Sequence, residues 1–311
     1  MIGALEGFGV IAVMIAAGWI LGRSGILGDS GQKVLASTVF YVGNPALLYM
    51  TLASTPLDIV FNQALLATAG SSIILAIALF VFTVSIRKRG VGEGVVSAWA
   101  VSYVNIGNLG IPIAAYVLGT LQYVAPVMLF QLVILAPVGM AILDAARAKR
   151  VGATDRRWWT PVLAVARNPI LWGAGLGIVA SATGFALPPV LHDPIEMLGN
   201  TAVPLTLMAF GISLKDGWAG PKPGTRTQLS VMTAAKLIVQ PVLAWLIGGP
   251  LLGIEGRDLL AIVVTSALPT AQNVYVYALQ YRQSETLTRD IVFITTVLSV
   301  PVIIVCALLF G

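Results

Sequence analysis

The sequence has little charge: Asp, Glu, Lys and Arg make up only 10% of its 311 residues, whereas 58% of the residues are hydrophobic. Soluble domains usually contain about 25% charged residues. No water-soluble fold could bury this much apolar surface, so lipid must form part of the solvent around the protein. The composition therefore predicts an all-α integral membrane protein.

Cysteine and histidine each occur once, as Cys306 and His192. One cysteine excludes an intrachain disulfide and a cysteine-cluster metal site, and we expect no cofactor. His192 stands in the stretch PPVLHDP, which predicts an exposed loop on the outer side of the membrane. No HExxH, GxSxG or GxxxxGK[ST] motif occurs, so the sequence indicates neither an intramembrane enzyme nor an ATP-driven protein.

What the sequence does contain is a series of apolar runs, each close to the roughly 20 residues that an α-helix needs to cross a membrane. We predict ten transmembrane helices, at residues 4–22, 32–55, 62–86, 93–118, 122–146, 168–186, 195–214, 229–249, 257–280 and 289–310. The first residues, MIGALEGFGV, carry no positive charge and are not expected to form a cleavable signal peptide.

The lysines and arginines follow the order of these spans. Sixteen of the eighteen lie in loops after odd-numbered spans, while Arg257 follows an even-numbered span and Lys236 lies inside span 8. Positive residues are retained on the cytoplasmic side, so ten spans with both termini extracytoplasmic fit this distribution. Membrane topology thus accounts for the net charge of +5, and no nucleic acid is expected as a partner.

The chain divides into two halves of five spans, residues 1–147 and 168–311, joined by a cytoplasmic linker at 148–167. Because five is odd, two homologous halves would insert with opposite orientations. Three proline pairs recur about half a chain apart: Pro45 and Pro204, Pro112 and Pro269, Pro137 and Pro301. They predict a 5+5 inverted repeat, an arrangement found in many transporters.

Two spans carry helix-breaking residues at matching places. Span 4 contains SYVNIGNLGIPIAAYVLG, and span 9 contains ALPTAQNVYVYALQY. Proline lacks a backbone donor and glycine weakens a helix, so we predict that both spans are broken and that the broken helices cross. Each break exposes a helix N-terminus, which attracts anions, and a C-terminus, whose carbonyls attract cations.

The residues around the breaks are candidates for binding a solute. The set comprises Asn105, Asn108, Gly110, Pro112, Pro269, Thr270, Gln272, Asn273 and Tyr275. Broken helices at corresponding positions of two halves indicate the midplane substrate site of a transporter. The alternative is that the amide side chains only join neighbouring helices by hydrogen bonds.

The same two stretches resemble a known family. YVNIGNLGIPIAAYVLG is similar to the fourth-span motif of the auxin efflux carriers, where an asparagine precedes glycines and Gly-Ile-Pro. ALPTAQNVYVYALQY is similar to their ninth-span motif, which opens Ala-Leu-Pro. The short central loop resembles the prokaryotic branch. Gln272 and Asn273 stand where the plant carriers are more apolar and have a second proline, which argues against auxin as the substrate.

The resemblance implies the fold of the bile acid/sodium symporters: a scaffold of spans 1, 2, 6 and 7 and a mobile transport domain of spans 3–5 and 8–10. The broken helices would then cross at Pro112 and Pro269. Asn105 would be the crossover asparagine, and Gln131 looks similar to a fifth-span glutamine of the family. The scaffold is also where we expect a homodimer to form.

On this basis we expect a secondary transporter in the bacterial plasma membrane (the inner membrane). It would move a small organic anion, a carboxylate, across the bilayer by an elevator mechanism. Two alternatives stay open: a sodium-coupled symporter of the bile-acid type, and a membrane sensor that binds its ligand without net transport.

Two residues outside the breaks are candidates for a charge or coupling role, Lys236 in span 8 and Asn44 in span 2. A charge near the bilayer centre costs about 2.5–3.5 kcal/mol on insertion scales. Lys236 either balances an anion or replaces a coupling cation, or its long side chain snorkels to the cytoplasmic interface. The coupling ion is open between Na⁺, H⁺ and none.

Overall fold

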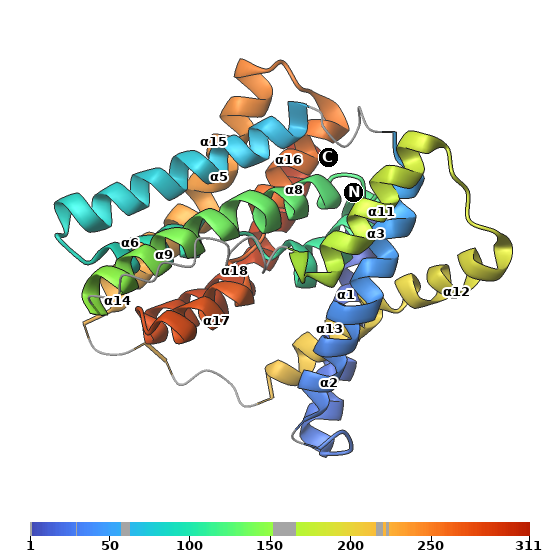
Figure 1. Ribbon diagram of the computed structural model, residues 1–311, viewed down its shortest axis with the longest axis horizontal. Helices are drawn as coiled ribbons and strands as arrows, with labels where there is room; N and C mark the ends of the chain where they lie inside the picture. Colours follow the sequence, from blue (N-terminus) through green and yellow to red (C-terminus); the bar gives the residue numbers. More distant parts are fainter. Residues whose placement is uncertain (1, 29, 57–62, 152–165, 216–219, 222–223) are drawn as a thin grey trace. The chain divides into compact units, whose positions relative to one another are not determined.

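The computed structural model describes residues 2–28, 30–56, 63–151, 166–215, 220–221 and 224–311 (Figure 1). Within these ranges the secondary structure is helical, and the β-structure consists of one isolated antiparallel bridge between Val104 and Thr270. Residues 152–165 of the predicted cytoplasmic linker lie outside the described residues.

Contacts between Cα atoms divide the chain into two compact units, and each is built from separate stretches of sequence. Unit 1 consists of Met1–Asn62, Gly107–Leu129 and Ala166–Trp218. Unit 2 consists of Gln63–Ile106, Phe130–Val165 and Ala219–Gly311. The units therefore do not coincide with the two sequence halves, and the predicted repeat domains stay a prediction.

Unit 1 is formed by short and medium-length helices. Its main elements are α1 (Ile2–Ser24), α2 (Gly31–Thr38), η1 (Val39–Gly43), α3 (Asn44–Ala53), α7 (Ile111–Ile113), η4 (Ala114–Leu118), α11 (Pro169–Thr183), α12 (Pro189–Asn200) and α13 (Ala202–Ser213), where η denotes a π-helical turn. Two helix pairs are the most closely associated, α1 with α13 and α11 with α3.

Glycines make these two pairings possible. A Cβ atom at Gly173 of α11 would lie 2.2 Å from the carbonyl oxygen of Pro45 in α3, and one at Gly18 of α1 would lie 2.2 Å from the carbonyl oxygen of Met208 in α13. A Cβ at Gly211 of α13 would likewise lie 2.1 Å from the carbonyl oxygen of Ile15. The backbones approach so closely only because no side chain intervenes, as at small-residue interfaces of membrane helices.

His192 lies in α12 and not in the predicted loop, so this expectation was wrong. Pro188 and Pro189 explain the difference, because a proline in the first turn has a φ suited to a helix and needs no hydrogen-bond acceptor. The imidazole is exposed, as predicted, and its Nδ1 lies 3.3 Å from a carboxylate oxygen of Asp193 and 3.9 Å from one of Glu196.

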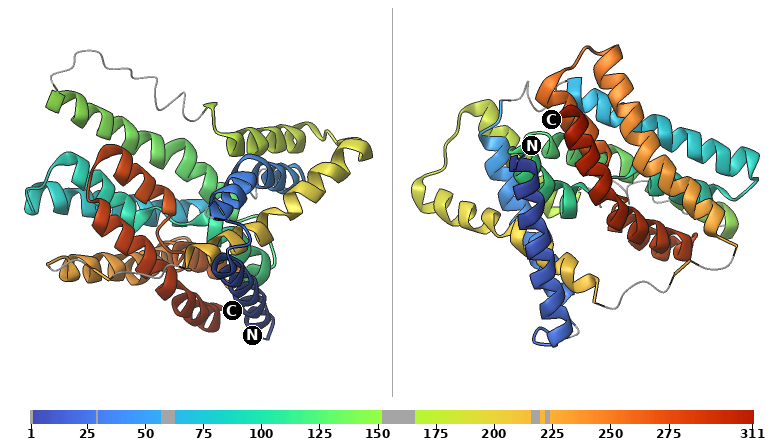
Figure 2. Two further views of the ribbon diagram at one scale, coloured as in Figure 1. Left: turned by 90° about the horizontal axis from the view of Figure 1, so that it is seen from below. Right: turned by 180° about the vertical axis from the view of Figure 1, so that it is seen from behind.

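Unit 2 surrounds two buried segments with longer helices, which can be followed by colour in Figure 2. Its elements are α5 (Gln63–Val81), η2 (Phe82–Ile86), α6 (Val91–Ser102), η5 (Gln131–Leu135), α9 (Ala136–Val151), α14 (Arg226–Ala234), η6 (Ala235–Val239), α15 (Gln240–Leu246), η7 (Ile247–Leu251), α16 (Gly256–Ser266), α17 (Gln272–Tyr281) and α18 (Glu285–Phe310). Every residue in 94–106 and in 260–271 is buried. These two segments form the interior of unit 2.

Prolines widen several helices without ending them. Four π-helical turns each stop two residues before a proline: η1 before Pro45, η3 (Ile106–Gly110) before Pro112, η5 before Pro137 and η6 before Pro241. A proline lacks an N–H group and its ring clashes with the carbonyl four residues earlier. A wider turn relieves that clash, so the chain stays helical.

Among the described residues, six helical segments are long and apolar enough to cross a membrane: Gly31–Ala53, Gln63–Ile86, Val124–Arg147, Pro189–Ser213, Arg226–Leu251 and Glu285–Phe310. Three shorter apolar helices are Gly9–Ser24, Ile106–Leu118 and Pro169–Thr183. The described residues are thus those of an all-helical integral membrane protein. The topology of ten spans stays a prediction.

Gly173 and Gly175 give a matched test of the packing of α11. We expect Gly173→Ala to lower the free energy of unfolding by about 1–3 kcal/mol, because the new Cβ meets the backbone of Pro45 and overpacks the interface. The thermal unfolding midpoint should fall with it. Gly175→Ala, which meets no atom within 4 Å, should leave the midpoint unchanged or raise it. Thermal unfolding of the purified protein in detergent measures both, and equal effects would contradict the assigned packing.

Candidate functional site: two paired helix interruptions

Both spans predicted to be broken are interrupted in unit 2. Helix α6 ends at Ser102, and helical structure resumes at Ile106. Helix α16 ends at Ser266, and α17 begins at Gln272. Residues 103–105 and 267–271 are the non-helical connections, and the second contains Pro269, as the sequence predicts.

The two interruptions bind each other through the backbone. The Asn105 N–H donates to the carbonyl oxygen of Pro269 at 2.7 Å, and the Ala271 N–H donates to the carbonyl oxygen of Tyr103 at 3.0 Å. Val104 and Thr270 face each other between these bonds as an antiparallel bridge. Each interruption therefore supplies the hydrogen-bond partners that the other lost on leaving its helix.

Side chains from other helices satisfy further backbone groups at the pairing. The Val104 N–H donates to Oε1 of Gln131 at 2.7 Å, and the Thr270 N–H donates to Oγ1 of Thr295 at 3.1 Å. The hydroxyl of Thr270 donates to the carbonyl oxygen of Ala100 in α6 at 2.6 Å. Gln131, which only the family resemblance indicated, thus contributes to this site by holding the chain at Val104.

Pro112 does not mark the interruption of span 4, and this part of the prediction was wrong. It lies seven residues after Asn105, buried in the helical run from Ile106 to Leu118. The preceding π-helical turn η3 accommodates the proline. The helix is interrupted earlier instead, where Pro269, Gln131 and Ala271 offer replacement partners.

The remaining predicted residues differ in exposure. In unit 2, Asn105 is buried, Gln272 and Tyr275 are partly buried, and Asn273 is exposed in the first turn of α17. In unit 1, Asn108 is partly buried in η3 and Gly110 is buried just before α7. Asn44 is buried as the first residue of α3. Unit 2 thus brings together Asn105, Gln131, Pro269 and Thr270.

Lys236 does not snorkel. Its side chain is 0% exposed, and its Nζ donates to Oε1 of Gln240 in the next helical turn. The Nε2 of Gln240 donates to the hydroxyl of Ser72 at 3.0 Å and to the carbonyl oxygen of Ser102 at 3.3 Å. Gln240 and Ser72 went unnoticed in the sequence. Gln240 follows Lys236 by one helical turn in the same apolar span, which was a signal of a polar pair on one helix face; no sequence signal pointed to Ser72.

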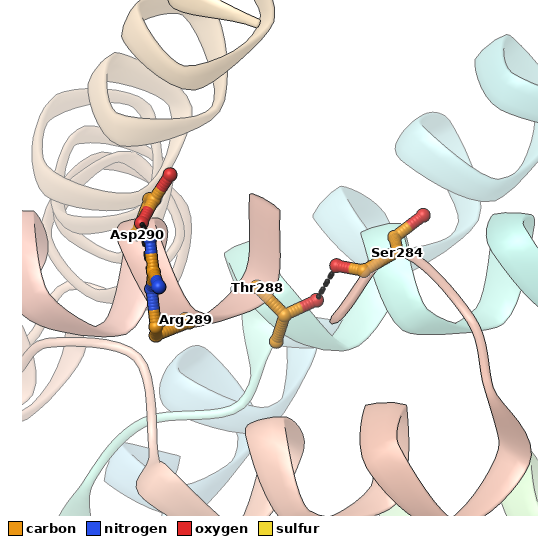
Figure 3. Close-up of polar contacts among 4 residues, drawn as sticks. All are labelled: Ser284, Thr288, Arg289 and Asp290. Carbon is orange, nitrogen blue, oxygen red and sulfur yellow. Dashed lines mark hydrogen bonds and ion pairs between the residues drawn. The ribbon is translucent and has the colours of Figure 1, made fainter. Parts of the chain in front are cut away.

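Asp290 is a second buried charge that the sequence reading missed. Its side chain is fully buried, and Nε and Nη2 of Arg289 donate to its Oδ1 at 3.0 and 2.7 Å (Figure 3). Two residues before Asp290, the hydroxyl of Thr288 donates to the carbonyl oxygen of Ser284 at 2.9 Å (Figure 3). Adjacent Arg and Asp near the start of an apolar run would have been the sequence signal.

The site contains amide, hydroxyl and backbone groups rather than an enzymatic constellation. Across the described ranges, no group of three or more His, Cys, Asp or Glu residues could hold a metal ion. Polar, largely uncharged groups at helix interruptions are suited to binding a solute inside a membrane protein.

Comparison with known proteins identifies the family. The family of membrane transport proteins matches residues 8–156 and 160–307. The chain belongs to this family, which includes the auxin efflux carriers. Its members are membrane transporters and not enzymes, so the protein is a membrane transporter.

Individual relatives agree with this assignment. The transporter is 26% identical over 277 residues to the "Putative malonate transporter" of Rhizobium meliloti (strain 1021), covering 86% of this chain and 84% of that protein. It is 23% identical over 307 residues to an "Uncharacterized transporter" of Methanothermobacter thermautotrophicus, covering 93% and 92%. It is 27% identical over 157 residues to the "Probable auxin efflux carrier component 9" of Oryza sativa, covering 49% and 36%.

Thr270 allows the hydrogen bonds of the pairing to be tested separately from its packing. Thr270→Val keeps the side-chain shape but leaves the buried carbonyl of Ala100 without this donor, which should lower the stability of the transporter by about 1–3 kcal/mol. Thr270→Ser keeps the hydroxyl and should lower the stability less. Thermal unfolding in detergent distinguishes the two; a valine variant as stable as the serine variant would contradict this role.

Proposed function

We propose that the protein is a secondary active transporter that moves a small organic anion, a carboxylate, across the plasma membrane. In this proposal the interrupted spans cross at the pairing of residues 103–105 with 269–271, and the substrate binds there. The observation that carries the proposal is the backbone pairing itself, with the Asn105 N–H bonded to Pro269 and the Ala271 N–H bonded to Tyr103.

The chemistry of the pairing favours an anion. Helix α17 begins directly after Ala271, and its first residues are Gln272 and Asn273. The N-terminus of a helix presents unbonded N–H groups and about half a positive charge. A carboxylate could accept hydrogen bonds from these groups and from the two amide side chains, without a buried formal charge in direct contact.

The substrate class rests on this chemistry and on one relative. The Rhizobium protein is named for malonate, a small dicarboxylate. Auxin is less well supported as a substrate, because the polar pair Gln272 and Asn273 stands where the plant carriers are more apolar. We therefore place small dicarboxylates first among the candidates.

For the mechanism we propose elevator-like alternating access. Unit 2 contains the pairing and the helices that support it, and unit 1 contains the predicted spans 1, 2, 6 and 7. Unit 1 also contains Gly107–Leu129, which belongs to spans 4 and 5. We assign unit 2 and this segment the role of the moving transport domain, and spans 1, 2, 6 and 7 that of the scaffold, through which a homodimer would form. Both termini are proposed to lie outside the cytoplasm.

Two alternative functions, sodium-coupled transport and ligand sensing, would use the same site differently. A sodium-coupled symporter of the bile-acid type would bind Na⁺ at backbone carbonyls and amide oxygens near the interruptions. A membrane sensor would bind the same anion without moving it. Uptake against a concentration gradient separates transport from sensing, and replacement of Na⁺ separates coupled from uncoupled transport.

Asn105→Ala and Asn273→Ala test the site. We expect each to lower the uptake of radiolabelled malonate into proteoliposomes by about tenfold or more, since each removes an amide that would bind the substrate. Their unfolding midpoints should stay near that of the wild type. Asn200→Ala, at an exposed asparagine that ends α12 in unit 1, is the control and should transport normally. Wild-type rates in both test variants would remove these residues from the site.

A ligand screen tests the substrate class before transport is measured. The purified protein would be heated with malonate, malate, other small carboxylates and indole acids, each in Na⁺ and in K⁺ buffers. A bound ligand raises the midpoint because it binds only the folded state. We expect dicarboxylates to give the largest shifts; stabilisation by neutral or cationic solutes alone would contradict an anion transporter.

A further inference from the structure

The buried residue Lys236 is connected to the interruption of span 4 by a short chain of hydrogen bonds. Its Nζ donates to Oε1 of Gln240, and Nε2 of Gln240 donates to the carbonyl oxygen of Ser102 at 3.3 Å. Ser102 is the last residue of α6. All three side chains are fully buried. The side-chain amide of Gln240 therefore bridges the Nζ of Lys236 and the C-terminal end of α6.

Three other carbonyls at or just after the end of α6 accept from protein donors. The carbonyl oxygen of Trp99 accepts from the Tyr103 N–H, that of Ala100 accepts from the hydroxyl of Thr270, and that of Tyr103 accepts from the Ala271 N–H. The carbonyl oxygen of Ser102 accepts from Nε2 of Gln240. Carbonyls at the end of a helix normally have no hydrogen-bond partner within the helix, and here these protein donors bind them. In transporters with broken helices such carbonyls are where Na⁺ is often coordinated.

Lys236 has a neutral hydrogen-bond partner in place of a salt bridge. Among the described residues, the ion pairs involve His192 and Arg289, and none involves Lys236. Its Nζ donates to the neutral amide oxygen of Gln240. The amide nitrogen of Gln240 donates in turn to the carbonyl oxygen of Ser102, at the partly negative end of a helix. An apolar side chain would be far cheaper to place here, so the charge is retained at a cost to stability.

We propose that Lys236 is a built-in substitute for a coupling cation. Its ammonium group supplies the positive charge that Na⁺ would bring to the end of α6, and Gln240 transmits that charge to the interrupted helix. The inference rests on the proposed function: a carboxylate bound at the pairing is balanced by Lys236, and its transport needs no Na⁺. Lys236 is a positioning and charge-balancing residue that does not itself touch the substrate.

The experiment compares two variants that differ in the space they leave. Lys236→Met keeps most of the side-chain volume but removes the charge. Lys236→Ala removes the charge and leaves a cavity with the shape of n-propylammonium. Each variant is purified with and without n-propylammonium chloride, with tetramethylammonium chloride at equal concentration as the control salt. Malonate uptake into proteoliposomes and the thermal unfolding midpoint are measured.

We expect both variants to lose uptake by about tenfold or more, because a charge-assisted hydrogen bond is lost. n-Propylammonium, but not tetramethylammonium, should restore uptake and raise the midpoint of Lys236→Ala. It should not rescue Lys236→Met, whose side chain fills the space. Uptake by the wild type should be the same when choline replaces Na⁺.

Three results would overturn the proposal: normal uptake by Lys236→Met, no effect of n-propylammonium on Lys236→Ala, or a wild type that requires Na⁺. The comparison of uptake in Na⁺ and in choline uses only the wild type, so it tests the proposal even if a variant does not fold. If the wild type takes up no malonate, the proposed function fails on that substrate. The unfolding midpoints of Lys236→Ala with the two salts still show whether an ammonium group is held at this position, and the absence of a selective rise with n-propylammonium would overturn the proposal.

Discussion

In the interior of a membrane protein, a backbone N–H or C=O that leaves a helix needs another partner, because lipid offers none. Unit 2 meets this constraint by placing its two interruptions against each other. Asn105 and Ala271 donate across the pairing, and Gln131, Thr270 and Thr295 complete it. The segments that are least regular are therefore also among the most buried. The pairing therefore holds both irregular segments in place without help from water or lipid.

The same constraint explains how far the sequence could be read. An interruption at Pro269 could be predicted because proline, threonine and two amides follow one another in an apolar span, and no wide turn absorbs that proline. Pro112 gave the same signal, yet the helix continues through it after the π-helical turn Ile106–Gly110. Proline shows that a helix will be disturbed. Whether it widens or breaks depends on partners distant in the sequence, such as Gln131 for Val104, and these follow only from the fold.

The sequence indicated the importance of Lys236 but not that of Asp290. The sequence identified Lys236 as exceptional but left snorkelling open, since the direction of a lysine side chain depends on neighbouring helices. Gln240 four residues later and Ser72 on α5 decide the matter by drawing the ammonium group inward. Asp290 was not singled out because it sits next to Arg289 near a predicted membrane boundary, where charges are common. Its complete burial follows from the packing of α18 within unit 2.

A fixed lysine and a binding site made of neutral groups suit each other physically. A carboxylate carried through a low-dielectric protein interior is costly if its charge stands alone, and the cost falls when a positive charge moves with it. Na⁺ can supply that charge only if it binds and leaves in every cycle. A lysine supplies it permanently, but it then also remains when the site is empty, and the empty domain carries an uncompensated cation. In the proposed arrangement, Gln240 and the negative end of α6 stabilise this charge through hydrogen bonds. A transporter with such a lysine therefore does not need the sodium gradient. Its empty state must instead be stabilised by the helix end that accepts the hydrogen bond.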